Sequence, residues 1–221
     1  MNTIKNIFIL LIIALPTSIL AQNGNKYGET ENEQILCKEA LSVYKSYNKQ
    51  KNYSEAYQQW EKACDVCPDR VQESLYSHGA LFLKNEIKNA DQAGDETRKA
   101  VLIDSLMWVY DMRMELFPST TKKPKNRCGV LGRAASDFYK FHKDSAEVAF
   151  EMFKESIECL EAKSSASVLS GYYVTSFYTM KAINKIDKEA GLVRKAGMLT
   201  DYLMLMEYCN TAIAVAEEAG K

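Results

Sequence analysis

From about Glu31 onward, apolar residues recur with the 3.6-residue period of an α-helix, and no segment alternates with the two-residue period of a strand over a useful length. Turn-forming residues interrupt the pattern, among them Asn52, Pro68 and Pro118. The pattern predicts an all-α chain of about eight helices, with an insertion before the last one, over residues 32–49, 53–66, 70–87, 95–117, 130–142, 144–161, 165–184 and 197–219. Because the loops are short, we expect consecutive antiparallel hairpins.

The first 21 residues have the pattern of a targeting segment. Lys5 precedes the uncharged run Ile7 to Leu15, Pro16 breaks this run, and Ala21 offers a cleavage site before Gln22. The run is too short for a bilayer span, which needs roughly 20 residues. We therefore expect a secretory signal peptide at 1–21, a flexible mature N-terminus at 22–30 and a helical domain at 31–221, with no stable membrane span after cleavage. The alternative is an uncleaved membrane anchor.

Charge and composition narrow the classes of partner. Lys and Arg number 28 against 29 Asp and Glu, so no global basic surface favours nucleic acid. Only two histidines are present, which disfavours multi-histidine metal sites, and we expect neither a metal nor another cofactor. The densest basic run, residues 122–127, could contact an acidic partner or phosphate, although a lysine-rich surface loop is the commoner explanation.

Export to an oxidising compartment would favour disulfides among the six cysteines. In a hairpin that turns at about Asn52, residues equally far from the turn lie side by side. Cys37 and Cys67 satisfy this condition, so the sequence predicts a bond between the start of the first helix and the end of the second. The other four cysteines, Cys64, Cys128, Cys159 and Cys209, are not assigned by this reasoning.

The first hairpin carries a spaced set of small and aromatic residues. Tyr47 is followed nine residues later by Ala56, then by Trp60, Ala63 and Pro68 at intervals of four, three and five. This spacing resembles the tetratricopeptide repeat, in which an aromatic residue on the first helix meets small and aromatic residues on the second. Later units keep only parts of the pattern, in Gly79 with Phe82, in Ala149 with Phe153 and Ser156, and in Gly171 with Tyr172 and Tyr173.

The resemblance implies a right-handed solenoid of stacked hairpins that binds a peptide or partner protein on its concave face. On the first hairpin, that face would present Lys38, Lys45, Asn48 and Lys49, which could pair with acidic side chains or a terminal carboxylate. The corresponding positions of the second unit do not repeat this basic pattern; they are Glu73, Tyr76, Ala80 and Lys84. We expect an exported interaction scaffold of a bacterial cell envelope, periplasmic or secreted, without catalysis.

The Cys64-Asp65-Val66-Cys67 segment supports an alternative function. With His78 it could serve an enzyme, or a metal or redox protein, built on an irregular helical bundle. The surroundings lack the strand–turn–helix context of a thioredoxin-like site, and no further ligands appear at zinc-site spacing.

The last predicted helix is apolar over a wide arc, whereas a solenoid normally ends in a helix with a polar outer face. Three explanations stay open: the natural chain continues, the helix folds back onto the core, or the face packs on a partner. A homodimer through this C-terminal helix is one form of the last explanation.

Overall fold

Residues 25–220 are described by the computed structural model, and they contain eight α-helices, one short 3-10 turn and no β-strand. The all-helical prediction is confirmed for this part of the chain. The helices are α1 Glu31–Lys49, α2 Tyr53–Val66, α3 Glu73–Ala93, α4 Glu96–Leu116, α5 Asn126–Phe141, α6 Ala146–Leu160, α7 Ala166–Ile186 and α8 Lys188–Glu218, with the turn η1 at Glu161–Lys163.

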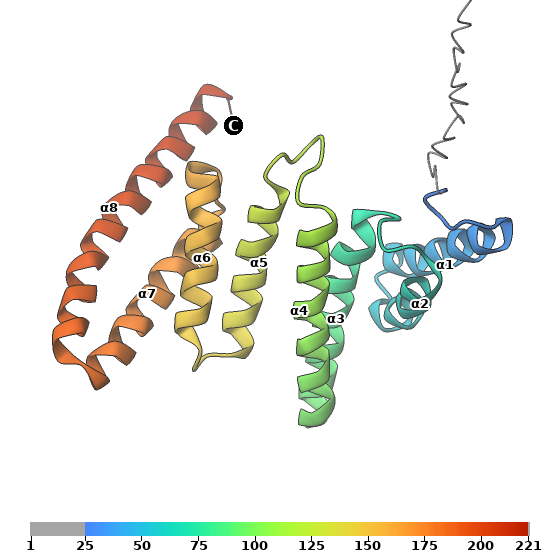
Figure 1. Ribbon diagram of the computed structural model, residues 1–221, viewed down its shortest axis with the longest axis horizontal. Helices are drawn as coiled ribbons and strands as arrows, with labels where there is room; N and C mark the ends of the chain where they lie inside the picture. Colours follow the sequence, from blue (N-terminus) through green and yellow to red (C-terminus); the bar gives the residue numbers. More distant parts are fainter. Residues whose placement is uncertain (1–24, 221) are drawn as a thin grey trace, which may run out of the picture.

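Each helix packs mainly against its neighbours in the chain, as short loops between amphipathic helices require. Figure 1 shows the helices following one another along the long axis of the molecule, with α1 and α2 at one end and α7 and α8 at the other. The core is divided accordingly. One apolar cluster extends from α1 to α5, and a second joins α5 to α8.

Aromatic side chains pack against glycines where neighbouring hairpins meet. Trp60 of α2 is 4% exposed and its indole N–H donates to the carbonyl of Leu75, at 2.8 Å. A β-carbon added to Gly79 of α3 would lie 2.4 Å from this indole ring. Phe153 of α6 packs in the same way on Gly171 of α7. The small and aromatic positions noted in the sequence therefore bring consecutive hairpins into close contact.

Three helix boundaries differ from the prediction by four residues or more. α3 continues to Ala93 and ends at Gly94, whose φ of 69° lies in the left-handed region that glycine adopts without strain. α5 begins at Asn126 instead of residue 130. The insertion expected before the last helix is wrong, because α8 is continuous from Lys188; Asp187 caps it by accepting the backbone N–H groups of Glu189 and Ala190.

Two disulfides link the ends of hairpins. Cys37 in α1 is bonded to Cys67 at the end of α2, which is the pair that the hairpin geometry predicts. Cys128 at the start of α5 is bonded to Cys159 near the end of α6. The sequence reasoning did not assign this second bond. Cys64 and Cys209 are free thiols.

The expected signal peptide at 1–21 lies outside the described residues. Residues 25–30 belong to the segment expected to be flexible, and they contact the start of α1. Thr30 accepts the N–H of Glu33 while the Glu33 carboxylate accepts the N–H of Thr30, a capping box that fixes the beginning of the helix. Within residues 25–220, no helix combines the length and the apolarity that crossing a bilayer requires.

Candidate interaction surface

The N-terminal turn adds an aromatic ring to the predicted lysine surface of α1. The ammonium groups of Lys26 and Lys38 lie 5.0 and 5.1 Å from the ring centroid of Tyr27. A cation at this distance from the face of a tyrosine ring is attracted to it. Tyr27 therefore holds the head groups of these two lysines together at the exposed start of α1.

Lys45 is half-buried and already has a partner. Its ammonium donates to the side-chain carbonyl of Gln72 at 2.8 Å, and the Gln72 amide donates to the Tyr44 hydroxyl at 3.1 Å. Burial lowers the pKa of Lys45, a charge interaction with Tyr27 partly offsets this, and the charges of Lys26 and Lys49 lower it further. Lys45 thus links α1 to the residue that precedes α3, and it contributes charge to the surface from a fixed position.

Asn48 and Lys49 lie in the last turn of α1. The Asn48 carbonyl accepts the N–H of Lys51 at 3.0 Å, which closes the loop to α2, and its side chain is half-buried. Lys49 is exposed, and within residues 25–220 its ammonium makes no ion pair. The four predicted residues therefore divide into two exposed cations, Lys38 and Lys49, and two residues with structural partners, Lys45 and Asn48.

His78 of α3 lies beside this surface, although sequence reasoning considered it only for the alternative site with Cys64 and Cys67. Its ring makes an edge contact with Tyr44, with ring centroids 5.9 Å apart, and it also contacts Phe82. Burial and the neighbouring Lys45 charge lower the pKa of His78, which favours the neutral ring. Its Nδ1 atom is buried and has no hydrogen-bond partner within the described chain. No spacing signal in the sequence brings His78 to Lys45.

The corresponding residues of the second unit have structural roles. Glu73 accepts hydrogen bonds from Arg113 and Asn126, and Lys84 forms an ion pair with Asp137 at 3.1 Å. Ala80 is buried, and so is Tyr76, whose hydroxyl donates to the Asp69 carbonyl at 3.0 Å. The free cations of the candidate surface are accordingly confined to the first hairpin and the turn before it.

The Cys64–Cys67 pair cannot form the dithiol that the alternative function uses, because Cys67 is bonded to Cys37. Burial raises the pKa of the Cys64 thiol to about 12, and the charges of Asp65, Glu61 and Asp69 act in the same direction. A nucleophilic cysteine needs the opposite environment, one that favours the thiolate. Among residues 25–220, no group of three or more His, Cys, Asp or Glu side chains is arranged to hold a metal ion.

Comparisons of the chain with family models, curated proteins and solved structures found no match. The likeness to the tetratricopeptide repeat therefore stays a prediction carried by residues 47–68. Within that segment, Ala56 and Ala63 are fully buried between helices. Function is inferred below from the residues of this chain alone.

Proposed function

We propose that the protein is an exported scaffold of a bacterial cell envelope that binds a peptide or partner protein on a tetratricopeptide-like array, without catalysis. The observation that carries this proposal is the surface of Tyr27, Lys26, Lys38, Lys45 and Lys49 on the first hairpin. A cluster of cations around an aromatic ring suits an acidic segment that also carries apolar side chains.

The hairpin disulfides support the exported part of the proposal. A Cys37–Cys67 bond persists in oxidising compartments, whereas cytosolic reductants keep most thiols reduced. Binding on this surface would not require the helices to move, because Lys45 and Tyr44 are already tied to Gln72. A preformed surface lowers the entropy cost of association.

The test compares two charge-matched double variants. Lys38→Glu with Lys49→Glu reverses the two exposed cations and leaves the Lys45–Gln72 bond in place. Lys62→Glu with Lys122→Glu makes the same change in net charge at exposed positions on α2 and on the loop after α4. Partners are captured from envelope extract under oxidising conditions and identified by mass spectrometry.

We expect a partner that the wild type and the Lys62/Lys122 variant both retain and that the Lys38/Lys49 variant loses. Its binding should weaken as salt is added, because surface charges are screened. Equal retention by both variants would contradict the assignment of the surface to the first hairpin. Equal loss from both would indicate only nonspecific attraction to positive charge.

A further inference from the structure

A pocket with aromatic walls and an acidic edge lies between α2 and α4. Both helices pack against α3 but not against each other, so the space between them is a groove with α3 at its base. Figure 1 shows α3 between α2 and α4 along the long axis of the molecule. The pocket in this groove has a volume of about 430 Å³, and it contains none of the residues of the lysine surface on α1.

The base and the α2 wall of the pocket consist of side chains in fixed positions. Trp60 of α2 and Leu83 of α3 are almost fully buried and form the base. The Trp60 ring is held in place because its indole N–H donates to the Leu75 carbonyl at 2.8 Å. The ring of Tyr57, which also lines the pocket, packs against that of Trp60, with centroids 5.9 Å apart. The aromatic surface of this wall is therefore preformed.

Trp108 of α4 forms the opposite wall. It is 48% exposed, whereas Trp60, the other tryptophan of the chain, is 4% exposed. Its ring contacts that of Tyr76, a buried residue of α3, with centroids 6.4 Å apart. The ring is therefore supported from the side of α3 while part of it stays accessible in the pocket. A concave site with aromatic walls and a few polar groups is the usual form of a ligand-binding site.

Two carboxylates line the edge of the pocket. Glu61 and Asp65 are four residues apart on α2, which places both on one face of the helix. The Tyr57 hydroxyl donates to the Glu61 carboxylate at 2.6 Å and so holds it beside the aromatic wall. Arg98, whose charge acts on Tyr57, is itself paired with Glu86 at 2.7 Å. Within residues 25–220, neither carboxylate of the pocket makes an ion pair, and no lysine or arginine lines it.

The negative charge of this edge reaches the interior of the pocket. The Cys64 side chain lines the pocket between the two carboxylates. Burial raises the pKa of its thiol, and the charges of Asp65, Glu61 and Asp69 raise it further. The pocket thus combines an unbalanced negative potential with accessible aromatic surface, and this combination suits a cation with a flat or apolar face.

We propose that this pocket binds an arginine side chain from a segment of a partner protein. The planar guanidinium would lie against the Trp108 ring, and its N–H groups would donate to the carboxylates of Glu61 and Asp65. A lysine ammonium has no flat face to stack and holds its hydration water more strongly, so arginine should be preferred. Free arginine should bind more weakly than arginine within a peptide, because the acidic edge repels its carboxylate. The pocket would therefore take a basic segment, whereas the lysine surface of α1 suits an acidic one.

Both tryptophans of the chain line the pocket, so intrinsic fluorescence reports its occupancy in the wild type. The whole chain, purified with its disulfides intact, is titrated at low ionic strength with a Gly-Arg-Gly tripeptide blocked at both ends. The same tripeptide with lysine or with citrulline, which has the shape of arginine without its charge, is titrated in parallel. We expect arginine to bind about tenfold more tightly than citrulline and about threefold more tightly than lysine. Calorimetry of the same pairs detects binding that leaves the fluorescence unchanged.

Three variants divide the site into its aromatic and acidic parts. Trp108→Leu removes the exposed ring and keeps an apolar helix former, and Glu61→Gln and Asp65→Asn remove one charge each with little change in shape. We expect each variant to weaken binding of the arginine tripeptide about fivefold. Glu115→Gln is the matched control, because Glu115 is an exposed carboxylate of α4 outside the pocket, and it should bind as the wild type does.

Equal affinity for the arginine and citrulline tripeptides would overturn the proposal, since the carboxylates would then not recognise the charge. Lysine that binds as tightly as arginine, or free arginine that binds more tightly than the tripeptide, would overturn the choice of a peptide guanidinium. Binding undetectable by both methods at about 10 mM would overturn the site itself. A Glu115→Gln chain weakened as much as Glu61→Gln would show only nonspecific attraction to negative charge.

Discussion

Two glycines set how closely neighbouring hairpins approach. Gly79 admits the Trp60 indole and Gly171 admits the Phe153 ring, and in both positions a β-carbon would come within 2.4 Å of a ring atom. Gly79 lies in an ordinary helical conformation, as the absence of a positive φ indicates. Glycine is therefore needed at position 79 because it leaves space for the Trp60 ring, and not because of its backbone flexibility.

Gly79→Ala should lower the free energy of unfolding by about 1–2 kcal/mol. Alanine is the better helix former, but the added methyl group must displace Trp60, and forced overpacking outweighs the gain in propensity. Urea denaturation followed by tryptophan fluorescence measures the change. Gly129→Ala is the control, because its methyl group meets no atom within 4 Å, and it should stabilise the protein by up to about 1 kcal/mol. A Gly79→Ala protein as stable as the control would contradict the packing argument.

At the scale of elements, the two disulfides occupy equivalent places in the first and third hairpins. Cys37 and Cys67 lie 15 residues either side of Asn52, and Cys128 and Cys159 lie 15 residues before Lys143 and after Asp144. The geometric reasoning that predicts the first bond would therefore have found the second, had it been applied to the turn between α5 and α6. Both bonds join the first helix of a hairpin to the end of the second.

Replacing Cys37 and Cys67 by serine should lower the free energy of unfolding by about 3–4 kcal/mol, the chain-entropy value for a loop with a sequence separation of 30. Denaturation of the oxidised wild type and the double variant gives the difference. Cys64→Ser removes a thiol without opening a bond, and it should cost at most about 1 kcal/mol. A double variant no less stable than Cys64→Ser would show that the bond does not stabilise the hairpin.

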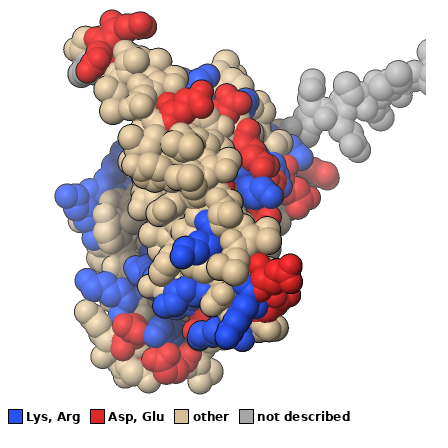
Figure 2. Space-filling view, turned by 90° about the vertical axis from the view of Figure 1, so that its left-hand side faces the viewer, with Lys and Arg blue, Asp and Glu red and all other residues tan. Residues whose placement is uncertain are grey.

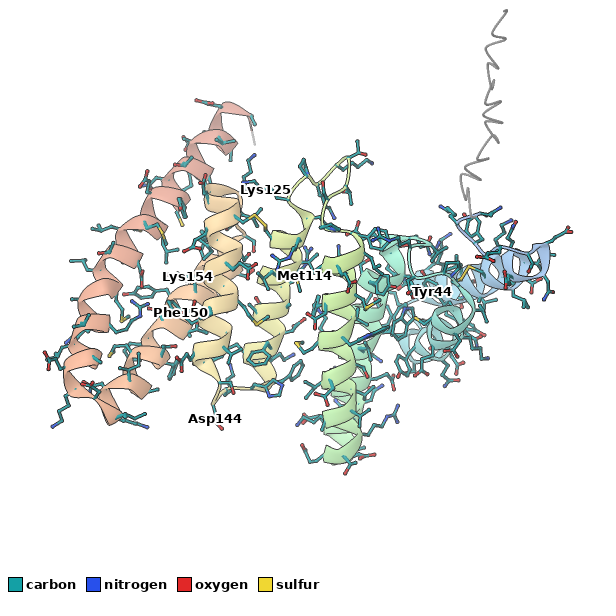
Figure 3. All side chains as sticks on the ribbon, viewed as in Figure 1. Tyr44, Met114, Lys125, Asp144, Phe150 and Lys154 are labelled. Atoms are coloured by element: carbon teal, nitrogen blue, oxygen red, sulfur yellow. A yellow bond between two sulfur atoms is a disulfide. The ribbon has the colours of Figure 1, made fainter. Side chains whose placement is uncertain are left out.

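At the scale of the whole molecule, the outer face of α8 is an extended exposed apolar surface. A stripe of residues at helical spacing runs along it, each at least 41% exposed: Leu192, Leu199, Leu203, Met206 and Ile213. Figure 2 views this end and shows a broad uncharged area over its upper half, with Lys and Arg gathered mainly in the lower half. The helix is held to its neighbours by the Arg194 guanidinium, which lies over the Phe150 ring that Figure 3 labels beside α6, and by the Tyr172 hydroxyl of α7, which donates to Asp201 at 2.9 Å.

We expect a second copy of the chain to cover this stripe in an antiparallel arrangement. The first half of α8 carries Lys188, Arg194 and Lys195 against Glu189 and Asp201, and the second half carries Glu207, Glu217 and Glu218 with no basic residue. A two-fold axis would therefore oppose a weakly positive half and an acidic half, and bury both stripes.

Sedimentation equilibrium should give twice the mass of one chain, and Leu199→Glu with Leu203→Glu should reduce it to one. Val101→Glu, at an exposed position of α4, is the control and should not change the mass. A wild-type chain that sediments as a monomer at all concentrations would contradict the dimer.

The number of helices and their order of packing could be predicted from the sequence, because helical periodicity and short loops act between residues close in the chain. For the same reason, the Cys37–Cys67 bond could be predicted from the sequence, because both cysteines belong to one hairpin. The predicted start of the last helix is wrong, because α8 begins at Lys188, directly after its cap Asp187, where an insertion was expected. A capping hydrogen bond is a matter of local geometry that the apolar pattern does not record.

The sequence by itself determined the helices, their hairpin order and the lysines of α1. Only the tertiary structure decided which of those lysines are free, since Lys45 is taken by Gln72, 27 residues away. It also decided the environment of Glu73, which accepts a hydrogen bond from the buried amide of Asn126, 53 residues away. Such contacts depend on how separate helices are positioned by their packing, and no periodic signal along one helix specifies a partner on another.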